Sequence, residues 1–88
     1  MPFFLPATVN QENANQLERE GFLNLTALGT VNCSALQDFD SSILAVLLAW
    51  RKKLHENQQS LIVEQAPEKL KVLAKVYGVS TLLGLWSI

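Results

Sequence analysis

The amino-acid sequence predicts a small α/β sandwich, with a mixed sheet of about four strands and three or four helices. Short apolar segments that suit strands alternate with longer segments whose apolar residues recur at helical spacing. Strands that alternate with single helices require the crossover connections of α/β folds. A chain of 88 residues, of which 49% are hydrophobic, can build one core but not two. We therefore expect residues 1–88 to form a single domain.

Three apolar segments are the predicted strands. Phe3–Thr8 is interrupted by Pro6, which suits an edge strand because proline cannot donate to a sheet ladder. Thr30–Ser34 alternates between polar and apolar residues and is typical of a central strand. Leu61–Val63 is a third, short strand after a polar break.

The first predicted helix is only weakly amphipathic. It should reach to about Glu20, and its candidate caps are Thr8, which has the capping-box spacing to Gln11, and Asn10. Gly21 follows at the position where glycine commonly ends a helix.

The strongest helical pattern covers residues from Ser42 to about Glu56. Cations gather near its C-terminal end, where they suit the helix dipole. Its apolar residues recur at helical spacing and predict a buried face. That face consists of Ile43, Leu47, Trp50 and Leu54.

A further helix should begin at Pro67, a residue favoured at the first helical position, and end at Gly78. Its predicted inner stripe is Leu70, Leu73, Ala74 and Tyr77. The apolar segment Val79–Leu85 then forms either a last strand or a short closing segment.

Charge and composition argue against several classes of partner. Seven basic and eight acidic residues leave a net charge of −1, so no overall field attracts nucleic acid or an anionic membrane. Lys69, Lys71 and Lys75 share one predicted helix without interleaved aromatics, which is typical of a solvated face. The longest apolar run, Ile43–Trp50, is shorter than the roughly 20 residues of a membrane span. One cysteine, Cys33, and no signal-peptide pattern lead us to expect a cytoplasmic location.

Catalysis has little support in the sequence. The single histidine, His55, lies in a polar helix end beside Glu56 rather than in an apolar setting that would suit a general base. Cys33 falls in a strand pattern, where a small buried side chain is commoner than a nucleophile. Nucleotide-binding glycine motifs and metal-ligand spacings are absent from the sequence. We expect no catalytic residue, no cofactor and no metal.

The acidic and hydroxylic residues before the strongest helix are the candidate site. Asp38, Asp40, Ser41 and Ser42 precede the apolar run directly. One of the last three should cap the helix, because a side-chain oxygen must accept from an otherwise unpaired backbone N–H. A cap explains one of these polar groups and leaves the others free, which favours a partner-binding surface.

Two phrases resemble the STAS domain, the fold of anti-sigma-factor antagonists and of the small MlaB-type subunits of lipid-transport ABC systems. They are "VNCSALQDFDSSILAVLLAWRKKL" and "PEKLKVLAKVYGV", and the resemblance covers about residues 30–83. It implies a STAS-like sandwich. The chain has Asn32 where the family usually has aspartate, and Ile43 where it usually has glycine or alanine.

The resemblance implies two alternative functions. An MlaB-type subunit would bind the ATPase of a phospholipid-transporting ABC system through this loop, with Ser41 as the functional hydroxyl, and would lie peripherally at the inner membrane. An anti-sigma-factor antagonist would instead be phosphorylated on Ser42 by a serine kinase and would bind an anti-sigma factor. A third possibility is a homodimer formed through a sheet edge or the apolar tail Leu82–Ile88, with Trp86 as an anchor.

Overall fold

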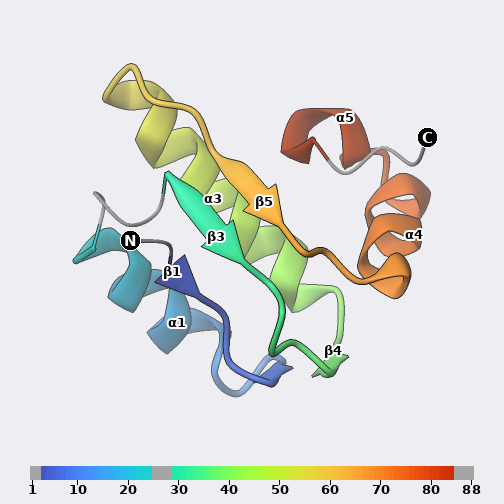
Figure 1. The fold of residues 1–88 in the computed structure, drawn as a ribbon. Coiled ribbons are helices and arrows are strands. Elements are labelled where there is room, and N and C mark those ends of the chain that lie inside the picture. The colour runs from blue at the N-terminus through green and yellow to red at the C-terminus, as the bar shows by residue number, and fades with distance from the viewer. Residues whose placement is uncertain (1–2, 25–28, 85–88) are drawn as a thin grey trace.

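The computed structural model describes residues 3–24 and 29–84 and confirms the α/β class. Five short strands and four helices make up this part of the chain (Figure 1). In chain order they are β1 (Phe3–Phe4), β2 (Thr8–Val9), α1 (Ala14–Phe22), β3 (Thr30–Asn32), β4 (Asp38–Phe39), α3 (Ser42–Glu56), β5 (Ile62–Glu64), α4 (Glu68–Val76) and α5 (Ser80–Leu83).

The strands form two parallel sheets rather than the predicted mixed sheet of about four strands. One sheet has the order β1-β3-β5, with Val31 paired to Phe3 on one side and to Val63 on the other. The other joins β2 to β4. The change of partner occurs on either side of Pro6: Leu5 still donates its backbone N–H to the Asn32 carbonyl beside β3, whereas the Ala7 carbonyl accepts from Gln37 and Asp38. The predictions of β1 at an edge and β3 at the centre are confirmed.

The helices α1 and α3 pack against each other and lie behind the three-stranded sheet in the view of Figure 1, while α4 and α5 lie together at one side. The predicted inner face of α3 is confirmed, because all four of its residues are fully buried. Between the layers, the ring of Phe3 on β1 meets the ring of Trp50 edge to face at 5.2 Å between centroids. The core therefore joins the sheet to α3 directly.

Helix α1 begins at Ala14, with Asn13 rather than Asn10 or Thr8 at its N-cap position. The Asn10 side chain accepts hydrogen bonds from the backbone N–H groups of Glu12 and Asn13, at 2.9 and 3.3 Å, and so stabilises a turn before the helix. Thr8 lies in β2, so the predicted capping box is wrong. Local side-chain bonds to Asn10 therefore compete successfully with an earlier helix start.

The sequence predicted that Gly21 ends the first helix. In the structure Gly21 instead lies inside α1 and is buried. A Cβ at this position would overlap the indole ring of Trp50. The same indole donates a hydrogen bond from Nε1 to the backbone carbonyl of Glu18 at 3.1 Å. The glycine is therefore needed because α1 approaches the largest side chain of the core too closely for any other residue.

The C-terminal part corrects one prediction and decides between two alternatives. In α4, Leu70 and Ala74 are buried, but Tyr77 is 59% exposed, so its assignment to the inner stripe was wrong. The segment after Gly78 is a short closing helix, α5, and not a last strand. A helix satisfies its backbone locally, through bonds such as Leu83 N–H to the Val79 carbonyl, and still buries Leu83. Leu85 and the predicted anchor Trp86 lie outside the described residues.

Candidate functional site

The four predicted site residues lie together where β4 runs into α3. Asp38 belongs to β4 and pairs with Thr8 of β2. The next residue but one, Asp40, donates its backbone N–H to the Val9 carbonyl at 3.1 Å. This pairing fixes the segment on β2, although the sequence predicted only a loop here. A two-residue strand has too few positions to show alternation, so periodicity could not have found it.

Asp40, the residue before the N-cap position, supplies the side-chain hydrogen bond at the start of α3. Its Oδ1 accepts a hydrogen bond from the backbone N–H of Ser42 at 2.8 Å, and its carbonyl accepts from Ile43 at 3.2 Å. The Ser42 backbone N–H and then the Ser42 hydroxyl lower the pKa of the Asp40 carboxyl, because both stabilise its charged form. Asp40 itself is exposed. The cap predicted among three residues is therefore assigned to the aspartate.

The two serines differ in exposure and in their neighbours. Ser41 occupies the N-cap position but makes no side-chain cap hydrogen bond, and it is exposed. Ser42 is half-buried, and its hydroxyl lies close enough to Asp40 to lower that carboxyl's pKa. Ser41 is therefore the hydroxyl available to a partner.

This geometry disfavours a phosphoryl group on Ser42. A phosphate dianion there would lie beside the ionised carboxylate of Asp40, and the two would repel each other. The positive end of a helix can offset such charge through its free N–H groups. Here the Ser42 N–H is already bound to Asp40, and the Ile43 N–H is bound to the Asp40 carbonyl.

The exposed side of α3 extends the site beyond the residues that the sequence indicated. Ala45 is exposed and Leu48 is half-buried, and they follow Ser41 at intervals of four and three residues. These intervals place all three on one side of the helix. We call Asp38, Asp40, Ser41, Ala45 and Leu48 the α3 surface. Its helical spacing was visible in the sequence, but the uninterrupted apolar run concealed which residues face outward.

Lys69 at the start of α4 is a second neighbour that sequence reasoning missed. Its ammonium group lies 5.5 Å from the ring centroid of Phe39, which is the buried residue between Asp38 and Asp40. A cation over an aromatic face is a favourable contact. It places the Lys69 ammonium group beside Phe39, the residue between the two aspartates.

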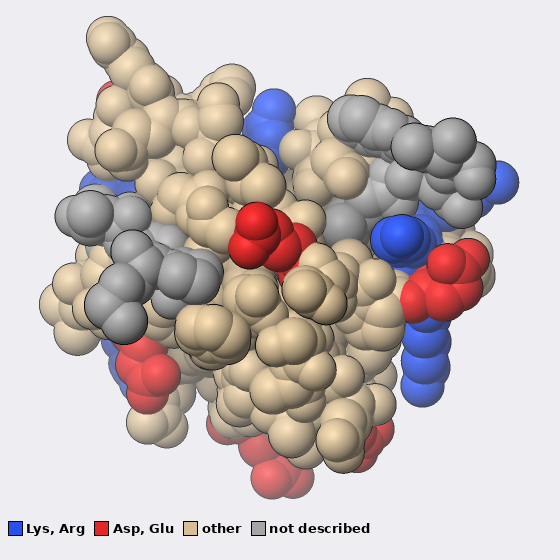
Figure 2. Space-filling model, viewed as in Figure 1, with Lys and Arg blue, Asp and Glu red and all other residues tan. Residues whose placement is uncertain are grey.

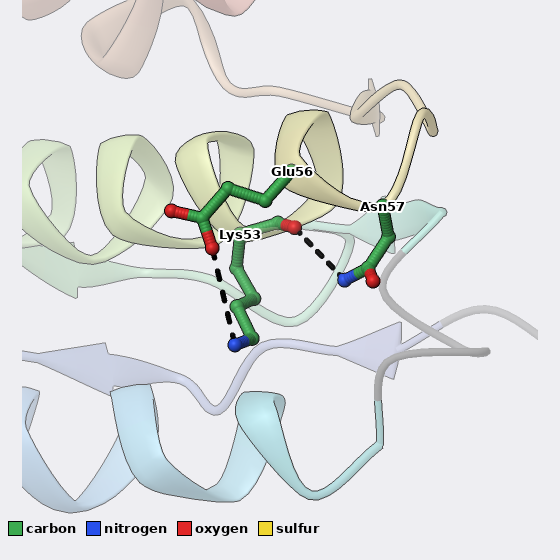
Figure 3. A network of polar contacts seen from close by, with 3 residues as sticks. All are labelled: Lys53, Glu56 and Asn57. Atoms are coloured by element: carbon green, nitrogen blue, oxygen red, sulfur yellow. Dashed lines mark hydrogen bonds and ion pairs between the residues drawn. The ribbon is translucent and has the colours of Figure 1, made fainter.

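The opposite end of α3 holds a groove of different character. The groove measures about 340 Å³ and lies between α1 and α3. Figure 3 shows this helix end, where Lys53 Nζ lies 4.0 Å from Glu56 Oε1 and the Asn57 side chain donates to the Lys53 carbonyl at 3.0 Å. The residues that line the groove are Glu18, Phe22, Ala49, Lys52, Lys53 and Glu56. None of the predicted site residues contributes to it.

The two residues weighed for catalysis lie apart from the α3 surface. Cys33 follows β3 and is buried, and burial raises the pKa of its thiol to about 11, which keeps the thiol neutral. His55 is exposed in the last turn of α3. Within residues 3–24 and 29–84, no helix is long and apolar enough to cross a membrane.

Comparison with known proteins gives one family match. The family described as "Mlab, STAS domain" matches residues 9–84, which include the whole β4–α3 junction and α4. A comparison with curated proteins gives no match.

Proposed function

The chain belongs to the STAS-domain family, in its MlaB-type branch, and we propose that it binds the ATPase of a phospholipid-transporting ABC system as an accessory subunit. The family supports a small regulatory or accessory protein, and STAS domains are generally non-catalytic. The proposal adds two things to the family: the partner is the ATPase, and binding to it holds the chain at the cytoplasmic side of the inner membrane.

The observation that carries the proposal is the hydroxyl of Ser41, which makes no cap hydrogen bond and stands at the head of a helix side where Ala45 is exposed and Leu48 is half-buried. Asp40 already caps α3, so Ser41 has no capping task. Ala45 and Leu48 continue from Ser41 along the helix with small or aliphatic side chains that let another surface approach closely. A partner can therefore gain apolar contact along α3 and hydrogen bonds at its start, as protein interfaces commonly do.

Co-purification tests the proposal directly. The full chain and the ATPase of a phospholipid-transporting ABC system from the same organism should elute as one complex, and Ser41→Arg should abolish the complex by placing a long charged side chain on the contact. Ser60→Arg is the matched control, because Ser60 is also exposed but lies beyond the far end of α3. An intact complex with Ser41→Arg would contradict the proposal.

The alternative in which Ser42 is a phosphorylation site has its own measurement. Intact-mass spectrometry after incubation with a serine kinase from the same genome should show no added phosphate. A single added phosphate that disappears with Ser42→Ala would contradict this expectation. It would favour a partner-switching protein over the ATPase-binding subunit.

A further inference from the structure

The outer face of α4 exposes apolar side chains that the fold does not use. Val72 and Val76 are 53% and 74% exposed, whereas Leu70 and Ala74 on the other side of the helix are fully buried. Lys69, Val72 and Val76 follow one another at intervals of three and four residues and therefore share one side of α4. We call these three residues the α4 stripe. β-branched valines are poor helix formers, so two of them on an exposed helix face gain nothing from propensity or from the core.

The charge around the α4 stripe is basic. Helix α4 carries three lysines and one acid, Glu68, and Figure 2 shows blue side chains gathered on the side of the molecule where α4 lies. Among the described residues, the ion pair found is Lys53 with Glu56 on α3, so the α4 lysines are not neutralised within the fold. A partner covering the two valines would bring its own side chains within reach of these cations. Complementary charges there must be carboxylates.

One end of the α4 stripe, Lys69, lies beside the segment that carries Asp38 and Asp40 of the α3 surface. The contact of Lys69 with the ring of Phe39 holds the N-terminal end of α4 against the segment that carries Asp38 and Asp40. One partner can therefore cover both elements. The two exposed aspartates would repel an anionic lipid surface, so a membrane suits this mixed face less well than a protein does.

We propose that the α4 stripe binds an amphipathic helix of the partner ATPase, one whose apolar side is flanked by aspartate or glutamate residues. The inference rests on the proposed function and adds a second contact to it, separate from Ser41. Apolar side chains of the partner helix pack between Val72 and Val76, and its carboxylates pair with Lys69 and Lys75. Helix-on-helix packing of this kind needs an exposed ridge of side chains three or four residues apart, which α4 provides.

The affinity of the purified full chain for the ATPase, measured by isothermal titration calorimetry, tests this contact. The double variant Val72→Gln with Val76→Gln should bind about tenfold more weakly or worse, because it removes the apolar contact. The double variant Lys69→Glu with Lys75→Glu should also weaken binding about tenfold, and should remove most of its dependence on salt. Glutamine is a better helix former than valine, and circular dichroism of each variant verifies that α4 remains folded.

Matched controls lie in α1 and at the residue that follows it, away from α4. Leu23→Gln removes a side chain that is 84% exposed, and Arg19→Glu reverses an exposed charge, so both should bind like the wild type. Wild-type affinity in both α4 double variants, with binding still lost in Ser41→Arg, would overturn the α4 contact and leave the proposed function standing. Failure of the wild-type chain to bind the ATPase would instead refute the proposed function.

Sedimentation with phosphatidylglycerol vesicles separates the protein partner from a lipid surface. The wild-type chain should remain in the supernatant. Sedimentation that is lost in the Lys69→Glu and Lys75→Glu double variant would overturn the inference in favour of an anionic membrane.

Discussion

Gly21→Ala tests how the close approach of α1 and α3 fixes the fold. In most helices this substitution stabilises, because glycine is about 1 kcal/mol less favourable than alanine in a helix interior. In this protein the new methyl group would overlap three atoms of the Trp50 indole, so the helices must separate or the ring must turn. Turning the ring would also break the hydrogen bond from its Nε1 to the Glu18 carbonyl.

The size of the effect follows from the two opposing terms. Overpacking a filled core costs about 1–3 kcal/mol, and an overlap with a buried ring belongs at the upper end of that range. Subtracting the gain in helix propensity leaves a net loss of about 2 kcal/mol in the free energy of unfolding. For a domain of this size, that corresponds to a fall in Tm of roughly 8–16 °C.

Urea and thermal unfolding followed by circular dichroism measure the loss. Asn15→Ala is the control, because Asn15 is an exposed residue of the same helix and alanine there should stabilise by a few tenths of a kcal/mol. In a Trp50→Leu background the cost of Gly21→Ala should shrink, since the smaller side chain leaves room for the methyl group. A Gly21→Ala protein as stable as the wild type would show that the contact with Trp50 does not limit the packing.

Three further predictions concern charge and packing. Asp40→Asn should lower the free energy of unfolding at neutral pH. A lowered folded-state pKa stabilises above the unfolded value near 4, so the deficit should fade as the pH falls through the folded-state pKa, and a deficit that persists in acid would refute the capping carboxylate. The Cys33 thiol should react with a disulfide reagent only as fast as the protein unfolds, and its contribution to stability should be lost as the pH rises from 9.0 towards about 11; rapid labelling of the native protein would contradict its burial. Leu54→Ala, at a fully buried position, should cost about 2–5 kcal/mol in urea unfolding, and a loss below 1 kcal/mol would mean that the site can collapse around the smaller residue.

The best sequence prediction was α3, whose bounds and buried face agree with the structure. Its four inner residues recur at helical spacing over about three turns, and a pattern of that length has few alternatives. The location of the candidate site followed from the same helix, because polar residues that cap a helix must stand at its start. Which of them caps it did not follow. Asp40, Ser41 and Ser42 all have a suitable oxygen, and only the backbone geometry shows that the aspartate accepts the bond.

The sequence by itself determined what depends on neighbours along the chain: the alternation of strands and helices, the inner face of α3, and a polar segment at its head. Only the tertiary structure decided what depends on residues far apart in the sequence. Gly21 resembled a helix end until Trp50, 29 residues later, proved to fill the space beside it. Phe39 and Lys69 gave no sign in the sequence that they meet, because they are 30 residues apart and only the fold brings the ammonium group to the ring. Periodicity records which side of an element is apolar, whereas the residue that faces it is set by how the elements pack.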